Sequence, residues 1–185
     1  MSNFFQDKEI KSAEDLRMGE YENCTFIDIN LSHFNFSSFK FSECEFCGCD
    51  LSLIQISETA FRNVKFKNCK MVGLHFDECN DFGLSFSFED CNLSHSTFYQ
   101  KDIRKTIFKN CNLNEVEFEE CNLTSAVFND SDLLNANFSN TNLENTDFRQ
   151  AFSYSIDLEQ NKIKNAKFSL HGLPGLLNKY PITIS

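Results

Sequence analysis

Cysteine and histidine are the residue types in this chain that most often bind metals or act as nucleophiles. The 185-residue sequence holds nine cysteines and four histidines. Cys44, Cys47 and Cys49 are close enough in sequence to suggest part of a metal cluster. In an extended segment, however, alternate side chains point to opposite faces, so Cys47 would point away from its two neighbours. The spacing therefore predicts no metal site.

The cysteines as a group follow a regular spacing. All except Cys47 precede a large apolar residue by two positions or hold the equivalent place in an irregular segment: Cys24, Cys44, Cys49, Cys69, Cys79, Cys91, Cys111 and Cys121. A free cysteine in such a place behaves as a small apolar residue. We therefore expect reduced, structural thiols that face inward, with Cys47 alone facing outward.

The histidines lack the partners that catalysis needs. None of His33, His75, His95 and His171 has an evident serine or cysteine nucleophile oriented by a carboxylate. The sequence also contains no glycine-rich loop of the kind that binds phosphate. We therefore predict a protein that is not an enzyme and that needs no cofactor.

The element that positions all these residues is a sequence repeat. Phenylalanine recurs every 20 residues, apart from one step of 22 residues between Phe66 and Phe88. The series comprises Phe26, Phe46, Phe66, Phe88, Phe108, Phe128, Phe148 and Phe168. A period of this length that carries the same large side chain indicates stacked coils of a solenoid.

Each 20-residue unit divides into four segments of five residues. A large apolar residue occupies every fifth position from Phe26 to Phe76 and again from Phe88 to Phe148. Two positions earlier lies a mostly small residue, and the residue between them is commonly Asn or Asp. Positions two apart share one side of an extended segment, whereas a five-residue period would spiral around a helix. The pattern predicts an all-β coil with four short walls, stacked at roughly 4.8 Å.

This succession of a small residue, Asn or Asp, Leu or Phe, and two further residues resembles the pentapeptide-repeat family. Cys121-Asn122-Leu123 and Ser131-Asp132-Leu133 are two examples. The resemblance covers about residues 19–170 and implies a right-handed, four-sided parallel β-helix. Residues 1–18 are expected to cap one end and residues 171–185 the other, because exposed coil edges invite aggregation.

The C-terminal segment breaks the repeat. We expect one short helical turn around Leu176 and Leu177, followed by a short strand. One interpretation is a hydrophobic lid. The other is a dimer contact, because the tails of the quinolone-resistance branch of the family are similar. The residues of that contact would be Leu173, Leu176, Leu177, Ile182 and Ile184.

The one irregularity of the repeat lies within residues 77–87, which hold two extra residues. We expect a bulge near residues 81–84, with Gly83 at positive φ. In the next coil Lys101 occupies an inward position that is otherwise small. Either Asp81 keeps register and points inward beneath Lys101, or the bulge displaces it and Lys101 extends outward. The second arrangement is favoured, because a buried ion pair is costly to form.

The net charge of −10 is unevenly distributed over the four walls. The wall of Phe36, Phe76 and Phe118 carries eight acidic residues and no lysine or arginine, whereas the other walls are mixed or nearly neutral. We call these residues the acidic strip: Glu58, Asp77, Glu78, Glu117, Glu119, Glu120, Asp157 and Glu159. About six coils at ~4.8 Å give the strip a length of roughly 29 Å. Phosphates along one DNA strand lie ~3.4 Å apart.

A rigid rod with a stripe of carboxylates suits a basic, DNA-binding channel. Family members similar to this chain are DNA mimics that bind type II topoisomerases. The resemblance therefore implies DNA gyrase or topoisomerase IV as the partner, and a second copy of the chain at the C-terminal end. The alternatives are a general interaction scaffold, or a self-immunity protein, with an unidentified partner and a merely solvated acidic wall.

Other classes of partner fit poorly. Direct nucleic-acid binding favours a basic patch with exposed aromatic residues, and the sequence shows none. No apolar run approaches the ~20 residues of a membrane span. The early charges of the N-terminal segment differ from the apolar core of a signal peptide. We therefore expect a cytoplasmic protein that contacts neither membranes nor nucleic acid.

Overall fold

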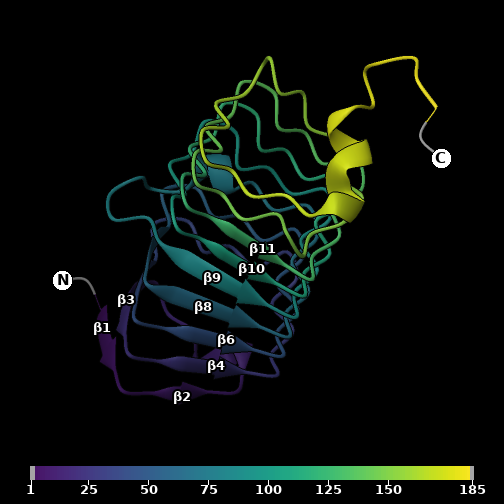
Figure 1. Cartoon of the computed structure of the whole chain (residues 1–185). Helices are drawn as coiled ribbons and strands as arrows, with labels where there is room; N and C mark the ends of the chain where they lie inside the picture. The colour runs from purple at the N-terminus through teal and green to yellow at the C-terminus, as the bar shows by residue number, and fades with distance from the viewer. Residues whose placement is uncertain (1–2, 184–185) are drawn as a thin grey trace.

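The chain winds into stacked coils along a single axis, with its two ends at opposite ends of the stack (Figure 1). This computed structural model describes residues 3–183. Neighbouring coils pair in parallel at the sequence period, as in Phe26↔Phe46 and Phe46↔Phe66. The irregular unit is absorbed without loss of register, because Phe66 pairs with Phe88. The predicted all-β, four-sided parallel β-helix is confirmed.

Short strands build two parallel sheets on two of the walls. One sheet has the order β1-β3-β5-β7 and the other β11-β10-β9-β8-β6-β4-β2. The strands are β1 Asn3–Gln6, β2 Glu9–Ile10, β3 Gly19–Glu22, β4 Thr25–Ile27, β5 Lys40–Ser42, β6 Glu45–Cys47, β7 Ala60–Arg62, β8 Val64–Lys67, β9 Phe86–Glu89, β10 Ile107–Lys109 and β11 Val127–Asn129. On the other two walls, and in the later coils, isolated parallel bridges replace strands, for example Thr97↔Glu117 and Glu117↔Asn137.

The core consists of columns of large apolar side chains, of which the column of the 20-residue series contains phenylalanine alone. The ring of Phe108 stacks on Phe88 at 5.3 Å between centroids and on Phe128 at 4.9 Å. All three rings are buried. Columns from adjoining walls meet edge to face, as Phe108 does with Phe118. Both geometries are favourable for aromatic pairs, so each added coil extends the same packing.

The cysteines line the inner side of the corners, as predicted. The eight in the inward position are buried, Cys47 is partly exposed, and all nine are free thiols. Six of these sulfurs donate to backbone carbonyls of the coil before, as Cys69 does to Phe46 O at 3.4 Å. Burial raises the pKa of the Cys111 and Cys121 thiols to about 12. They therefore stay protonated and unreactive at neutral pH.

The corners depend on a left-handed backbone position two residues after each large apolar residue. Asn23, Asn63 and Asn110 are typical examples, with φ near 51°. Many other corners are closed by a hydrogen bond across four residues, such as Phe34 N to Leu31 O at 2.8 Å, whereas Asn23 N and Asn110 N donate to the next coil, to Ser42 O and Asn129 O. Asn and Gly tolerate positive φ, which explains why Asn is so frequent in the repeat.

The two ends of the stack are closed differently. Residues 3–18 form a shortened coil with the 3₁₀ helix η1 (Ala13–Asp15), and β1 and β2 pair with β3 and β4. At the other end the 3₁₀ helix η3 (Leu170–Leu176) lies across the last coil. Gly172 and Gly175 pack so closely against Tyr154 that a Cβ atom at either position would collide with it.

The C-terminal prediction is only partly right. The helical turn is present, and Leu176 is buried at 7% exposure, as a lid requires. The expected strand is wrong for residues 181–183, which follow a turn and have no regular structure. Ile184 lies outside the described residues. The reason is that residues 181–183 have no neighbouring strand to pair with, and Ile182 N instead donates locally to Tyr180 O at 2.8 Å.

Replacing Phe108 by alanine should lower the free energy of unfolding by about 3–5 kcal/mol, because it leaves a cavity between two stacked rings. Its neighbour Ile107 faces outward at 46% exposure. Ile107→Ala is therefore the matched control, with an expected cost below about 1 kcal/mol. Denaturant unfolding of both variants measures the difference. Equal losses would contradict the inward and outward assignment.

Candidate interaction surface

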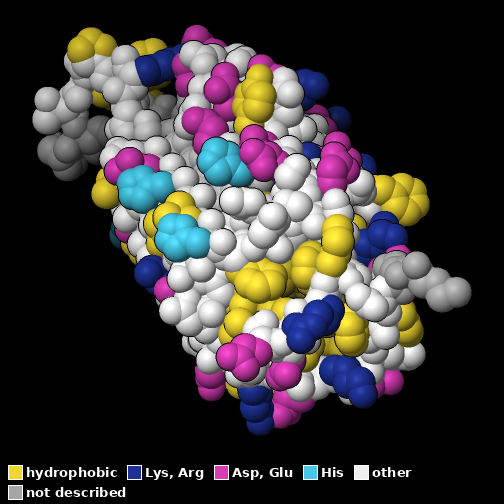
Figure 2. Space-filling model, turned by 180° about the vertical axis from the view of Figure 1, so that it is seen from behind, with side chains coloured by type: hydrophobic (Ala, Val, Ile, Leu, Met, Phe, Trp, Pro, Cys, Tyr) yellow, Lys and Arg dark blue, Asp and Glu magenta, His cyan; other side chains and the backbone are white. Residues whose placement is uncertain are grey.

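The acidic strip lies on the wall opposite the β4-to-β11 sheet. Figure 2 shows this face, where acidic side chains gather over the C-terminal half, and lysine and arginine also appear among the N-terminal coils. Asp77 and Glu78 belong to the 3₁₀ helix η2 (Phe76–Glu78). Glu58 and Glu120 occupy left-handed corner positions, with φ of 56° and 57°. The repeat therefore places the strip's side chains at the surface, where solvent or a partner can reach them.

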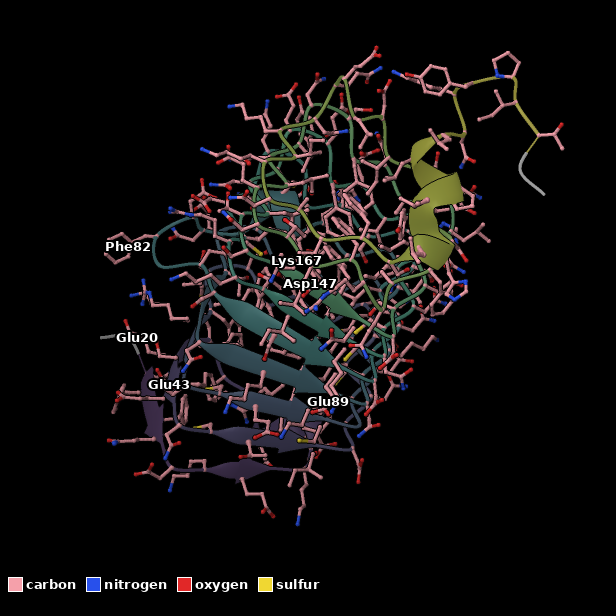
Figure 3. The ribbon with its side chains drawn as sticks, in the orientation of Figure 1. Glu20, Glu43, Phe82, Glu89, Asp147 and Lys167 are labelled. Carbon is pink, nitrogen blue, oxygen red and sulfur yellow. The ribbon has the colours of Figure 1, made fainter. Side chains whose placement is uncertain are left out.

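Several acidic residues on the other walls are paired with lysine or arginine, most often from a neighbouring coil. Lys40 pairs with Glu20, Lys67 with Glu45 and Lys109 with Glu89. Asp147 accepts from Arg149 at 2.7 Å and lies 3.9 Å from Lys167. Figure 3 labels Glu20, Glu89, Asp147 and Lys167, which lie on walls other than that of the strip. These pairs follow from stacking, because residues 20 or 22 apart are nearest neighbours.

Three of the six strip carboxylates from Glu58 to Glu120 accept from neutral groups, and Asp77 Oδ1 lies 3.5 Å from His75 Nδ1. Asn80 Nδ2 donates to Glu58 Oε2 at 3.1 Å. Gln100 Nε2 donates to Glu120 Oε2 at 2.7 Å, and Glu117 Oε1 accepts from the backbone N–H of Glu119 at 3.1 Å. Within residues 3–183, no lysine or arginine forms an ion pair with the six strip residues from Glu58 to Glu120. These contacts fix the side chains and leave the negative charge uncompensated.

The C-terminal end of the strip is different, because the tail folds onto it. Lys179 Nζ lies 2.8 Å from both Asp157 Oδ1 and Glu159 Oε2. Tyr180 Oη donates to Glu159 Oε1 at 3.3 Å. The hydrogen bond from Lys179 lowers the pKa of Asp157, and the two carboxylates raise the pKa of Lys179. The expectation that no basic residue lies on this wall is therefore wrong at Asp157 and Glu159, because counting within the repeat omits the tail.

The strip is also discontinuous. The coil between Glu78 and Glu117 presents Tyr99 and Gln100 on this wall. The next neutral coil presents Asn137, whose Oδ1 accepts from the backbone N–H of Ser139 at 2.9 Å. The uncompensated charge is thus concentrated in two clusters. One contains Glu58, Asp77 and Glu78, and the other contains Glu117, Glu119 and Glu120.

Comparison with known proteins agrees with this geometry. Residues 84–175 match the model of the family described as pentapeptide repeat region. The chain belongs to the pentapeptide-repeat family. No curated protein matches it by sequence. Its fold is similar to that of solved structures of QnrB1, titled a plasmid-mediated fluoroquinolone resistance protein.

The likeness of this pentapeptide-repeat chain to QnrB1 spans both chains. Two trypsin-treated QnrB1 variants give TM-scores of 0.66 and 0.64 at 14% identity. The alignments cover 100% of this chain, and 100% and 98% of those chains. Full-length QnrB1 gives a TM-score of 0.57 at 14% identity, covering 97% of this chain and 100% of the other. At this identity the likeness establishes a shared fold.

The interruption of the pentapeptide repeat forms a bulge loop, which we define as residues 80–85. Gly83 has φ of +72°, as predicted. The side chain of Asp81 is 80% exposed, so it does not point into the core. Lys101 nevertheless stays buried, at 7% exposure, and donates to Cys79 O at 2.9 Å and Asp81 Oδ1 at 2.6 Å. The prediction that Lys101 extends outward is wrong, because the bulge brings two acceptors to the ammonium group.

The residues predicted for a dimer contact divide into two groups. Leu176 is buried under the lid and Leu177 is half-buried. Leu173 and Ile182 are exposed at 44% and 57%. Sequence reasoning missed Leu170, which is 83% exposed at the start of η3. The C-terminal end thus combines an inner apolar layer that closes the core with an outer one that faces solvent.

Features of other functional classes are not seen in the described part of the chain. Among residues 3–183, no group of three or more His, Cys, Asp or Glu side chains is arranged to hold a metal ion. None of the helices described is long and apolar enough to span a bilayer. The acidic clusters are therefore the most distinctive chemistry of this surface.

Replacing Lys179 by alanine should raise the pKa of Asp157 towards the ordinary value of about 3.9, because the cation that stabilises the carboxylate is removed. In the native chain the contact is fully present above about pH 4 and is lost as pH falls through the lowered pKa. An NMR titration of the Asp157 carboxyl carbon measures both midpoints. Lys164→Ala, at an exposed lysine, is the control. Equal midpoints in the native and Lys179→Ala chains would contradict the contact.

Proposed function

We propose that this pentapeptide-repeat protein is a non-catalytic DNA mimic that binds a type II topoisomerase, DNA gyrase or topoisomerase IV, through its acidic strip. The observation that carries the proposal is the contrast between walls. Several carboxylates on the other walls are paired with lysine or arginine, whereas the six carboxylates of the two clusters have no such partner among residues 3–183. Unpaired charge of one sign on one wall favours a cationic partner.

The spacing of the two clusters along the strip is compatible with a partner surface that binds DNA. The two clusters are centred two to three coils apart, which is roughly 12 Å at the strand spacing. That distance matches three to four phosphate intervals of ~3.4 Å along one DNA strand. The carboxylates project from a parallel β-helix whose core is packed ring on ring, so little ordering is needed on binding.

The choice of topoisomerase follows from the family. Pentapeptide-repeat proteins that this chain resembles are DNA mimics of this class, and QnrB1 shares its fold over the whole length. Fluoroquinolone resistance is a property of QnrB1, and it makes gyrase the first partner to test for this chain. We further propose that the chain acts in the cytoplasm, where such a partner works.

The second candidate is an interaction scaffold, or a self-immunity protein, with another partner. The neutral coils of Tyr99 and Asn137 favour it, because they interrupt what would otherwise be a continuous ladder of charge. A scaffold of this kind would leave supercoiling unchanged.

Purified protein should inhibit gyrase supercoiling, or protect gyrase from ciprofloxacin, and the effect should weaken as salt rises because the contact is electrostatic. Replacing Glu117, Glu119 and Glu120 by lysine should abolish it. Replacing the same three by glutamine should weaken it by at least about tenfold while keeping the hydrogen bond to the backbone N–H of Glu119. A titrated supercoiling assay at two salt concentrations measures these effects.

The matched control places the same charge change on the opposite wall. Asp28, Asp90 and Asp130 follow the phenylalanine series at exposed corners, so their replacement by lysine changes the net charge equally. This control should retain the effect of the native chain. Loss in the control as well would show that only net charge matters. A native chain without effect at tens of micromolar would favour the scaffold.

We also propose that the exposed apolar residues of the C-terminal end bind a second copy of the chain. Replacing Leu173 and Ile182 by aspartate should convert a dimer to a monomer, because each would bring an unpaired charge into the interface. Light scattering coupled to size exclusion measures the mass. Leu134→Asp, at a 48% exposed residue of a central coil, is the control. A native chain that is monomeric would refute the proposed contact.

A further inference from the structure

Phe82 is the most exposed aromatic residue among residues 3–183, at 78% exposure. Its ring projects from the tip of the bulge loop, away from the coils (Figure 3). Every phenylalanine of the 20-residue series from Phe26 to Phe148 is buried. The two extra residues of the irregular unit therefore present an apolar ring to solvent, where a partner can cover it.

The bulge loop is held from the coil below. Arg62 Nε donates to Phe82 O at 3.3 Å, and its guanidinium lies 5.4 Å from the centre of the Phe82 ring. Within the loop, Asn80 Oδ1 accepts from the backbone N–H of Phe82 at 3.0 Å. Below the tip, Ser85 N donates to Phe61 O at 2.9 Å. The Phe82 ring is thus positioned by hydrogen bonds to the Phe82 backbone and by the guanidinium of Arg62 against the face of the ring.

The coil above holds the loop as well. Lys101 reaches from its buried position to the carbonyl of Cys79 and the carboxylate of Asp81, on the N-terminal side of the tip. Arg62 and Lys101 therefore fix the loop from two neighbouring coils. A loop that is already ordered loses little entropy when it binds, so an exposed ring on it is well suited to an interface.

The surroundings of the ring indicate the kind of partner. Phe82 borders a hollow that is also lined by Glu58, Asp77 and Glu78, one of the two clusters of the acidic strip, and by the Asp81–Lys101 pair, so its net charge stays negative. Aromatic residues are enriched in the cores of protein interfaces, and charged residues lie at their rims. The combination fits a protein surface with an apolar pocket flanked by basic residues.

We propose that Phe82 is an aromatic anchor that inserts into an apolar pocket of the type II topoisomerase, beside basic groups that face Glu58, Asp77 and Glu78. The inference rests on the proposed function, because it names the same partner. It adds a contact for which a DNA duplex has no counterpart. The anchor therefore contributes affinity that does not depend on mimicry of phosphate charge.

The test compares the affinity of gyrase for the native full-length chain and for Phe82→Ala, each at low and high salt. Phe82→Ala should weaken binding at least about tenfold, as truncation of an interface anchor does. The factor should be the same at both salt concentrations, because salt screens charges and not apolar contacts. Phe82→Leu should retain most of the affinity. Phe152→Ala, at a 51% exposed phenylalanine on the opposite wall, should bind like the native chain.

Each of the following results would contradict the proposal that Phe82 is an anchor. If Phe82→Ala binds within about twofold of the native chain while the Glu117, Glu119 and Glu120 reversal abolishes binding, the anchor is wrong and the proposed function stands. If the native chain binds neither gyrase nor topoisomerase IV, both are wrong. If the loss in Phe82→Ala shrinks with salt, or comes with a lower melting temperature, the residue acts through loop order or charge and is not an anchor.

Discussion

Every feature of this protein depends on one constraint, which is that each coil must lie in register on the one before it. Parallel pairing fixes neighbouring coils at the strand spacing of roughly 4.8 Å, so the side chain at one position lies directly over its counterpart one unit earlier. Phe108 between Phe88 and Phe128 shows what this requires of the core. A large ring must recur at every unit, because a smaller side chain would leave unfilled space between the rings of the coils above and below it.

The same constraint explains the irregular unit. Two residues in excess cannot be accommodated within a coil without shifting Phe88 from its place over Phe66, so they are expelled as a loop. The expelled segment leaves Lys101 in an inward position, and the carbonyl of Cys79 and the carboxylate of Asp81 satisfy its ammonium group. The two inserted residues do not fit within the packed coil, so they form an ordered surface loop that exposes Phe82.

Register also controls the surface charge. Outward residues one unit apart are close neighbours, so like charges in successive coils repel and opposite charges attract. Three walls contain ion pairs of this kind, such as Lys109 with Glu89. The strip departs from the rule by placing one neutral coil, that of Tyr99 and Gln100, between its two clusters of carboxylates. That arrangement limits repulsion within the wall while leaving the charge free for a partner.

The sequence by itself determined the architecture, the inward cysteines, the site of the bulge and the wall that holds the strip. It could do so because all four follow from a period that local side-chain alternation makes visible. Only the tertiary structure decided that Lys179 neutralises Asp157 and Glu159, that Lys101 stays buried, and that Phe82 is exposed. Each of these depends on segments that leave the repeat. Their positions are set by contacts that the inserted loop and the tail make, and no periodicity encodes where those segments go.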